Sequence, residues 1–384
     1  MPISYPYIQY GGIWTTSQAT DAVASGTWAT PPAPHLFAWG RNDFGQLGLG
    51  NTTNYSSPKQ VGSLTNWSSI VINLPNSFAI KTDGTLWSWG TNNQGQLGLG
   101  NTTNYSSPKQ VGSLTNWLNI SSSGYNNLAI KTDGTLWSWG TNQAGQLGLG
   151  NTTKYSSPKQ VGSITNWSNI SAGQYYALAV QSNGTLWSWG ANNYGQLGLG
   201  NRTNYSSPKQ VGALTNWLTV SAGNYNNYAV KTDGTLWTWG YNAQGQLGLG
   251  NQTYYSSPKQ VGSLTTWKSA TGNLFALATK TDGTLWSWGF NLFGALGLNN
   301  TINYSSPMQI GSLTTWSQIA LGNYHSASIK TDGSLWIWGY NNYGQLGLGN
   351  RTNYSSPKQV GSLTSWQKLF TGATSYSTLA IAKT

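Results

Sequence analysis

The side chains that could carry acid–base, nucleophilic or metal-binding chemistry are few in this sequence. Its 384 residues contain no Cys, no Glu, two His and seven Asp. A thiol nucleophile, a Cys-based metal site and most acid–base constellations therefore cannot be assembled. A glycoside hydrolase needs two carboxylates about 5–10 Å apart, whereas most of the Asp residues recur singly before a Gly at regular intervals. The sequence predicts a protein that is not an enzyme, with no catalytic residue, no metal and no cofactor.

The composition excludes further classes of protein. Only 7% of the residues are charged, against about 25% in a typical soluble domain. Aromatic residues make up 13%, which supplies enough apolar surface for a core and argues against disorder. No apolar run approaches the roughly 20 residues of a membrane span, and the first residues lack the basic start and apolar core of a signal peptide.

An internal repeat explains this composition. The segment Leu-Trp-Ser-Trp-Gly and its near copies begin at Leu36, Leu86, Leu136, Leu186, Leu236, Leu285 and Leu335. The spacings are 49 or 50 residues, so residues 36–384 comprise seven units. We expect two parts: an N-terminal arm with a Pro-rich linker over residues 1–35, and one repeat domain over residues 36–384.

The sequence of each unit predicts four short strands and no helix. In the unit that begins at Leu86 these strands fall at residues 86–89, near 109–111, and at 117–120 and 128–132. An Asp-Gly turn joins the last strand to the next unit, which is typical of a tight hairpin. Four strands repeated seven times predict an all-β fold, a seven-bladed β-propeller of four-stranded blades. The last strand, at residues 379–384, has no following partner, so we expect it to pair with residues 36–39 and close the ring.

The repeated Trp and Gly residues have a structural and a functional interpretation. Trp87 and Trp89 are two apart on a strand and share one face, which favours packing between blades; sugar-binding Trp is the alternative. The Gly-rich segment at residues 95–100 superficially resembles a phosphate-binding loop. Because no helix follows it and it recurs in nearly every unit, a tight turn explains it better.

The units resemble a known family. Each contains, with small variations, Trp-Gly-x-Asn-x-x-Gly-Gln-Leu-Gly-Leu-Gly, then Ser-Pro-Lys-Gln-Val and then Leu-Ala-Ile-Lys-Thr-Asp-Gly-Thr-Leu-Trp. This pattern resembles the repeat of the RCC1 (regulator of chromosome condensation) family over residues 36–384. The resemblance implies a seven-bladed propeller, and it implies an intracellular interaction scaffold or a guanine-nucleotide exchange module as a possible function. The basic N-terminal tail of RCC1 has no match here.

Two stretches of the unit vary between copies. One follows Trp-Gly and the other precedes the strand with Ala-Ile-Lys-Thr, so both flank the same hairpin at the end away from the Asp-Gly turn. We expect them on one face, which we call the variable face, and its Tyr and Asn are typical of binding loops. Neutral drift at loop tips is the alternative. The candidate binding residues are Arg41, Phe44, Tyr125, Asn126, Tyr175, Tyr176, Tyr194, Tyr225, Asn226, Tyr241, Phe275, Phe290, Phe293, Tyr324, His325, Tyr340, Tyr343 and Tyr376. We expect His325 to be a surface residue of its loop, and His35 to lie in the linker without a partner.

Basic residues account for the net charge of +11. A predicted basic ring has one Lys in each of six units, at Lys59, Lys109, Lys159, Lys209, Lys259 and Lys358, with Met308 in the remaining unit. No acidic residue lies near these Lys in the repeat. Solubility and repulsion between copies explain the ring, and contact with an acidic partner is the alternative; a nucleic-acid platform normally has denser basic residues. A second set, which includes Lys81 and Lys131, precedes the turn Asp and should be locally balanced by it.

The N-terminal arm does not repeat. Its candidate anchoring residues are Tyr5, Tyr7, Tyr10, Trp14 and Trp28, and a short helix is predicted at residues 18–25. Tyr10-Gly11-Gly12-Ile13-Trp14-Thr15-Thr16-Ser17-Gln18, followed by Ala24-Ser25-Gly26-Thr27-Trp28, resembles the start of virion structural proteins of tailed marine bacteriophages. This resemblance implies an arm that binds other virion proteins.

Two functions of different classes follow. The first is a virion structural protein, located on the particle as a tail fibre, collar or capsid-decorating component, whose variable face binds a host-surface glycan or receptor. The alternative is the cytoplasmic RCC1-like scaffold or exchange module. Neither function includes a membrane span.

Overall fold

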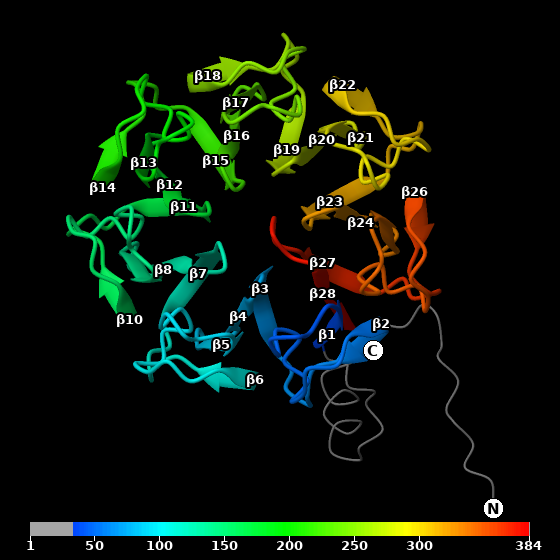
Figure 1. Ribbon diagram of the computed structural model, residues 1–384, viewed down its shortest axis with the longest axis horizontal. Helices are drawn as coiled ribbons and strands as arrows, with labels where there is room; N and C mark the ends of the chain where they lie inside the picture. The colour runs from blue at the N-terminus through cyan, green and yellow to red at the C-terminus, as the bar shows by residue number, and fades with distance from the viewer. Residues whose placement is uncertain (1–33, 384) are drawn as a thin grey trace, which may run out of the picture. The chain divides into compact units, whose positions relative to one another are not determined.

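The computed structural model describes residues 34–383, which form 28 β-strands in seven four-stranded antiparallel sheets (Figure 1). The innermost strand of each sheet is β3 (Trp67–Asn73), β7 (Trp117–Ser122), β11 (Trp167–Ala172), β15 (Trp217–Ala222), β19 (Trp267–Gly272), β23 (Trp316–Leu321) or β27 (Trp366–Phe370). The second is β4 (Asn76–Lys81), β8 (Asn126–Lys131), β12 (Tyr176–Gln181), β16 (Asn226–Lys231), β20 (Phe275–Lys280), β24 (His325–Lys330) or β28 (Ser377–Lys383). The third is β1 (Pro34–Gly40), β5 (Leu86–Gly90), β9 (Leu136–Gly140), β13 (Leu186–Gly190), β17 (Leu236–Gly240), β21 (Leu285–Gly289) or β25 (Leu335–Gly339). The outermost is β2 (Tyr55–Gln60), β6 (Tyr105–Gln110), β10 (Tyr155–Gln160), β14 (Tyr205–Gln210), β18 (Tyr255–Gln260), β22 (Tyr304–Gln309) or β26 (Tyr354–Gln359).

These sheets are the blades of a propeller, arranged in a ring with the inner strands around its centre (Figure 1). Blade I contains β27, β28, β1 and β2, and blades II to VII follow in chain order as β3–β6, β7–β10, β11–β14, β15–β18, β19–β22 and β23–β26. The predicted all-β propeller is confirmed.

Blade I closes the ring with two strands from each end of the described chain. Strand β28 pairs with β1 from Pro34↔Lys383 to Gly40↔Ser377, as expected for the last strand. Because β1 begins at Pro34, that residue and His35 belong to the propeller rather than to a linker. His35 also has a partner, since its Nδ1 lies 3.2 Å from Gln60 Nε2; the expectation that it has none is wrong.

Trp residues join each blade to the one before it. The Trp that precedes the final Gly of each third strand is fully buried, and its indole N–H donates a hydrogen bond to a backbone carbonyl of the preceding blade. Trp89 donates to Gln46 O at 2.8 Å, and Trp139 to Gln96 O at 3.0 Å. Trp39 donates to Gln345 O at 2.9 Å, which repeats this bond across the closure. Packing between blades is therefore the role of these Trp residues.

The Gly-rich segment after each third strand is a turn. Gly98 has a φ of +75°, and a Cβ there would lie 2.8 Å from the Trp139 indole nitrogen. Only Gly fits at such a position, because a positive φ disfavours other residues and the ring leaves no space. The next element is the outer strand β6, which begins at Tyr105, four residues earlier than predicted. Pro108 lies inside that strand and is tolerated because an outermost strand needs no hydrogen-bond donors on its free edge.

Candidate interaction surfaces

The two variable stretches lie on one face, as predicted, because a backbone hydrogen bond joins them in every blade. Thr141 N donates to Tyr125 O at 3.0 Å, and Tyr241 N donates to Tyr225 O at 2.9 Å. In blade I, Arg41 N donates to Tyr376 O at 3.0 Å. The variable face thus consists of the loops between inner and second strands and the loops between third and outer strands.

Five candidate binding residues are buried rather than exposed on the variable face. They are Asn126, Tyr176, Asn226, Phe275 and His325, all at most 2% exposed. Each is the first residue of a second strand, and its side chain enters the interior of the blade. Tyr176, for example, donates its hydroxyl to Asn227 Oδ1 of the next blade at 2.7 Å.

His325 shows what this burial does to a titratable group. Its Nε2 lies 3.0 Å from Thr378 Oγ1, and no described residue pairs with its Nδ1. Burial lowers the pKa of His325 to about 3, because desolvation disfavours the charged imidazolium. The ring is therefore neutral at physiological pH and is a core residue rather than a surface ligand.

Six of the other candidates form a continuous row of rings, which we call the aromatic ladder. Its members are Phe290, Phe293, Tyr324, Tyr340, Tyr343 and Tyr376. Neighbouring centroids are 4.8–6.3 Å apart, and the ladder extends over blades VI, VII and I. These separations and the tilted or edge-to-face geometry are those of favourable aromatic pairs.

Arg41 extends the ladder at its blade I end. Its guanidinium carbon lies 5.1 Å from the centroid of Tyr343, 5.8 Å from that of Tyr376 and 5.6 Å from that of Phe44. Arg41 Nε also pairs with Asp43 at 2.6 Å, the one salt bridge within residues 34–383. An Arg held over aromatic faces keeps donors free for a partner, since the guanidinium carries five N–H groups.

A second group of rings lies in blades IV and V. The centroid of Tyr194 is 5.0 Å from that of Tyr225 and 5.2 Å from that of Tyr241. Tyr254, which sequence analysis did not select, packs on Tyr241 at 4.8 Å. The remaining candidates, Tyr125 and Tyr175, make no aromatic contact among the described residues, and Tyr125 is 38% exposed.

The basic ring lies on the outer strands, with one Lys on each of six blades. All six are exposed, and each ammonium lies 5.4–5.7 Å from the ring of a Tyr on its own strand, as for Lys109 over Tyr105 and Lys59 over Tyr55. None pairs with a carboxylate within the described part of the chain. The charges are spread around the rim rather than gathered into one patch.

The second Lys set lies between Trp rings instead of pairing with Asp. Lys131 is only 6% exposed, and its Nζ lies 3.7 Å from the Trp137 centroid and 5.0 Å from that of Trp117. Burial lowers the pKa of Lys131, and nearby Asp133 opposes that shift. Asp133 Oδ1 instead accepts hydrogen bonds from Thr135. Asp133 therefore acts on the charge of Lys131 through a longer-range Coulomb interaction, and the two side chains form no ion pair.

Lys131→Gln is expected to lower the free energy of unfolding by about 1 kcal/mol, because it removes a partly desolvated cation–π contact. Blade IV has Gln181 at this position, and Gln181 is 6% exposed, so the substitution should fit the space. Urea unfolding measures the change. Lys109→Gln, the same substitution on the exposed ring, should change stability by less than about 0.5 kcal/mol; equal losses in both variants would contradict the role of the two Trp rings.

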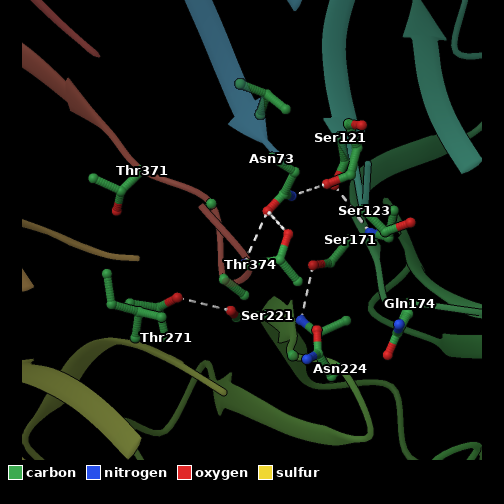
Figure 2. A pocket seen from close by; sticks show the side chains of 18 of the residues that line it. Asn73, Ser121, Ser123, Ser171, Gln174, Ser221, Asn224, Thr271, Thr371 and Thr374 are labelled. Carbon is green, nitrogen blue, oxygen red and sulfur yellow. Dashed lines mark hydrogen bonds between the residues drawn. The ribbon is translucent and has the colours of Figure 1, made fainter. Parts of the chain in front are cut away.

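The centre of the variable face is hollowed by a cavity of about 140 Å³ that all seven inner strands or the residues after them line (Figure 2). Its lining is rich in uncharged hydroxyl and amide groups. Most of them bond to the neighbouring blade: Ser121 Oγ accepts from Ala172 N at 2.9 Å, and Ser221 Oγ donates to Thr271 Oγ1 at 3.1 Å. These groups join the inner strands, and few are left for a ligand.

The opposite face carries an apolar ring that the sequence analysis missed. In six blades an exposed Leu or Ile precedes the inner strand, at Leu64, Leu114, Ile164, Leu214, Leu264 and Leu313. They are 39–48% exposed. Because this position is apolar in every unit, it resembles a core position in sequence, and only the fold reveals its exposure.

The fold and these surfaces define a seven-bladed propeller with one varied, aromatic face. A family model for the RCC1-like domain matches residues 35–272, and models for the RCC1 repeat match residues 282–329 and 332–378. Since the first match covers more than half of the chain, the protein belongs to the RCC1-like family.

Solved structures share the fold at low sequence identity. Prp20p from Saccharomyces cerevisiae is 18% identical with a TM-score of 0.81, over 92% of each chain. Human WBSCR16 is 21% identical with a TM-score of 0.80, over 92% of this chain and 99% of its own. Yeast RCC1 (Prp20) bound to Kap60 is 18% identical with a TM-score of 0.81, over 99% of this chain and 96% of its own. No curated protein sequence matches the chain.

The N-terminal predictions lie outside the described residues. This applies to Tyr5, Tyr7, Tyr10, Trp14 and Trp28, and to the helix at residues 18–25. The resemblance of the arm to virion proteins receives no support from these comparisons. Within residues 34–383, no group of three metal-ligating side chains occurs, and no helix has the length and apolar character of a membrane span.

Proposed function

We propose that this protein is a non-enzymatic RCC1-like interaction module that binds a partner protein through the aromatic ladder and Arg41. The continuity of the ladder over three blades carries this proposal. Tyr and Arg are enriched among residues that dominate protein–protein binding energy, and here they are gathered where the repeat varies. An extended row of half-buried rings suits a broad protein surface better than a small molecule.

The relatives support a protein partner. Prp20p was described together with its binding to Gsp1p and histones, and with Kap60 bound. At 18% sequence identity the similarity to Prp20p concerns the fold alone. The partner of this chain need not be one of these proteins.

Guanine-nucleotide exchange and a virion role are weaker proposals. Among the described residues, Asp43 is the only carboxylate on the variable face, and Arg41 already occupies it. The virion role depends on residues 1–35, of which the structure describes only Pro34 and His35.

The test compares the Tyr340→Ala/Tyr376→Ala variant with Tyr125→Ala/Tyr175→Ala, which removes two rings from the same face outside the ladder. Each immobilised protein is exposed to an extract of the cells that produce it, and the retained proteins are purified and titrated by calorimetry. A partner retained by the wild type and the control should bind the ladder variant at least about 30-fold more weakly, as the loss of one hot spot of about 2 kcal/mol implies.

Two results would refute the proposal. One is a partner that binds the ladder variant with unchanged affinity. The other is a partner lost through Leu114→Ala/Leu214→Ala, which would place the interface on the opposite face. Thermal unfolding of every variant separates loss of binding from loss of structure.

A further inference from the structure

The group of Tyr residues in blades IV and V borders a cavity of about 180 Å³, which we call the tyrosine cavity. Its walls come from loops of three successive blades: Tyr194 from blade IV, Tyr225 and Tyr241 from blade V, and Leu274 from blade VI. This cavity adjoins the central one, since Asn224 lines both, and none of its lining residues belongs to the aromatic ladder.

The aromatic wall is built to hold its shape. Tyr194, Tyr225 and Tyr241 form a triangle with centroid distances of 5.0, 5.2 and 6.4 Å, and Tyr254 supports Tyr194 and Tyr241 from outside. Each ring is tilted or edge-on to its neighbours. Such mutual packing fixes the rings before a ligand arrives, which lowers the entropic cost of binding.

Two buried amides at the cavity have atoms without partners. Asn226 is 2% exposed; its Nδ2 donates to Tyr228 OH at 2.8 Å, and no described group donates to its Oδ1. Gln246 is 1% exposed; its Oε1 accepts from Gln244 N at 2.8 Å, and its Nε2 donates to no described group. Both residues line the cavity, so this acceptor and this donor are available to a ligand there.

The chemistry of the lining restricts that ligand. No charged side chain lines the cavity, so the ligand is neutral. The volume is below the roughly 300–1,000 Å³ of pockets that enclose drug-sized molecules, which allows one ring. A hydroxyl group can donate to Asn226 Oδ1 and accept from Gln246 Nε2, whereas a proline-rich peptide, the other common ligand of Tyr-lined grooves, has few N–H donors.

We propose that the tyrosine cavity binds one neutral pyranose unit of a glycan, with the sugar ring against the Tyr wall and hydroxyl groups paired with Asn226 and Gln246. This site is distinct from the proposed protein interface, because the Tyr residues of the wall lie outside the ladder. Either function can fail without the other.

Saturation-transfer NMR on the full chain tests the site, with the methyl glycosides of glucose, galactose, mannose and N-acetylglucosamine as probes. At least one of them should bind, and Tyr241→Ala should weaken that binding at least tenfold. Tyr241→Phe keeps the ring and should retain most of the affinity. Gln246→Ala should weaken binding while thermal unfolding stays cooperative. Tyr340→Ala, in the ladder, is the matched control and should bind the sugar as the wild type does.

Several outcomes would overturn the proposal. The first is the absence of saturation transfer to any of the four glycosides. The second is sugar binding that Tyr241→Ala leaves unchanged, and the third is sugar binding that Tyr340→Ala weakens as much as Tyr241→Ala does. Binding of decaproline that depends on Tyr241, in the absence of sugar binding, would assign the cavity to a peptide instead.

Discussion

A chain truncated after Ser375 is expected to lose its cooperative fold. The truncation removes β28, which pairs with β1 along its whole length and with β27 on the other side. Leu379 and Ile381 pack in the core between blades I and II, and Ala380 and Ala382 in the core between blades VII and I. Each buried Leu or Ile contributes about 1.5–3 kcal/mol. With the edges of β1 and β27 also exposed, the loss approaches the 5–15 kcal/mol that typically stabilises a whole domain.

Circular dichroism and differential scanning calorimetry check this expectation. The truncated chain should show no cooperative unfolding transition, or aggregate through its unpaired strand edges. The matched control removes residues 1–33, a far longer terminal segment that lies outside the seven described sheets. That chain should unfold with a transition close to that of the full protein. A cooperative, little-changed transition in the chain without β28 would show that closure of the ring is not needed for stability.

The repeat made the architecture predictable from sequence. Strand number, blade number and the pairing of the last strand with residues 36–39 all followed from one unit and its spacing. The outer strands were placed least well: β6 begins at Tyr105 rather than near Lys109. Its Tyr-Ser-Ser-Pro start has no alternation of apolar and polar residues, because an outer strand buries little on either side, and Pro108 opposes a strand prediction.

The variable face was predictable, but the orientation of its side chains was not. Adjacent variable residues such as Tyr324 and His325 look equivalent in sequence, yet the first is in a loop and the second begins a strand. Side chains alternate along a strand, so a shift of one residue in the strand start decides burial. At two of these positions the side chain bonds to the next blade, as Tyr176 does to Asn227 and His325 to Thr378.

The two cavities and the ladder could not be derived from one unit. Tyr194 and Tyr225 belong to different blades and meet only when the ring is formed. The same holds for Phe293 and Tyr340 in the ladder. Sequence identifies which positions vary, whereas the angle between blades determines which of them touch.

His325 is expected to make the protein less stable as the pH falls below about 6.5. In the folded state burial lowers the pKa of His325 to about 3 from its usual 6.5. The contribution of the buried, neutral imidazole to the free energy of unfolding is fully present above pH 6.5. It is lost progressively between pH 6.5 and 3, because in that range the unfolded chain binds a proton at this His and the folded chain does not. At about 1.4 kcal/mol per pH unit, the free energy of unfolding should fall by roughly 3 kcal/mol between pH 7.5 and 4.5.

Urea unfolding at pH 7.5, 5.5 and 4.5 measures this loss, and His325→Asn is its natural control, since Asn76, Asn126 and Asn226 occupy the equivalent position in three other blades. The variant should fit the space and lack the loss. The Asp residues of the turns do not obscure the result. Hydrogen bonds from Thr135, for example, lower the pKa of Asp133 below its usual 3.8. The stability that this carboxylate contributes is therefore present above pH 3.8 and is lost only in more acidic solution. If wild type and His325→Asn lose stability equally between pH 7.5 and 4.5, the imidazole of His325 is not buried as the fold requires.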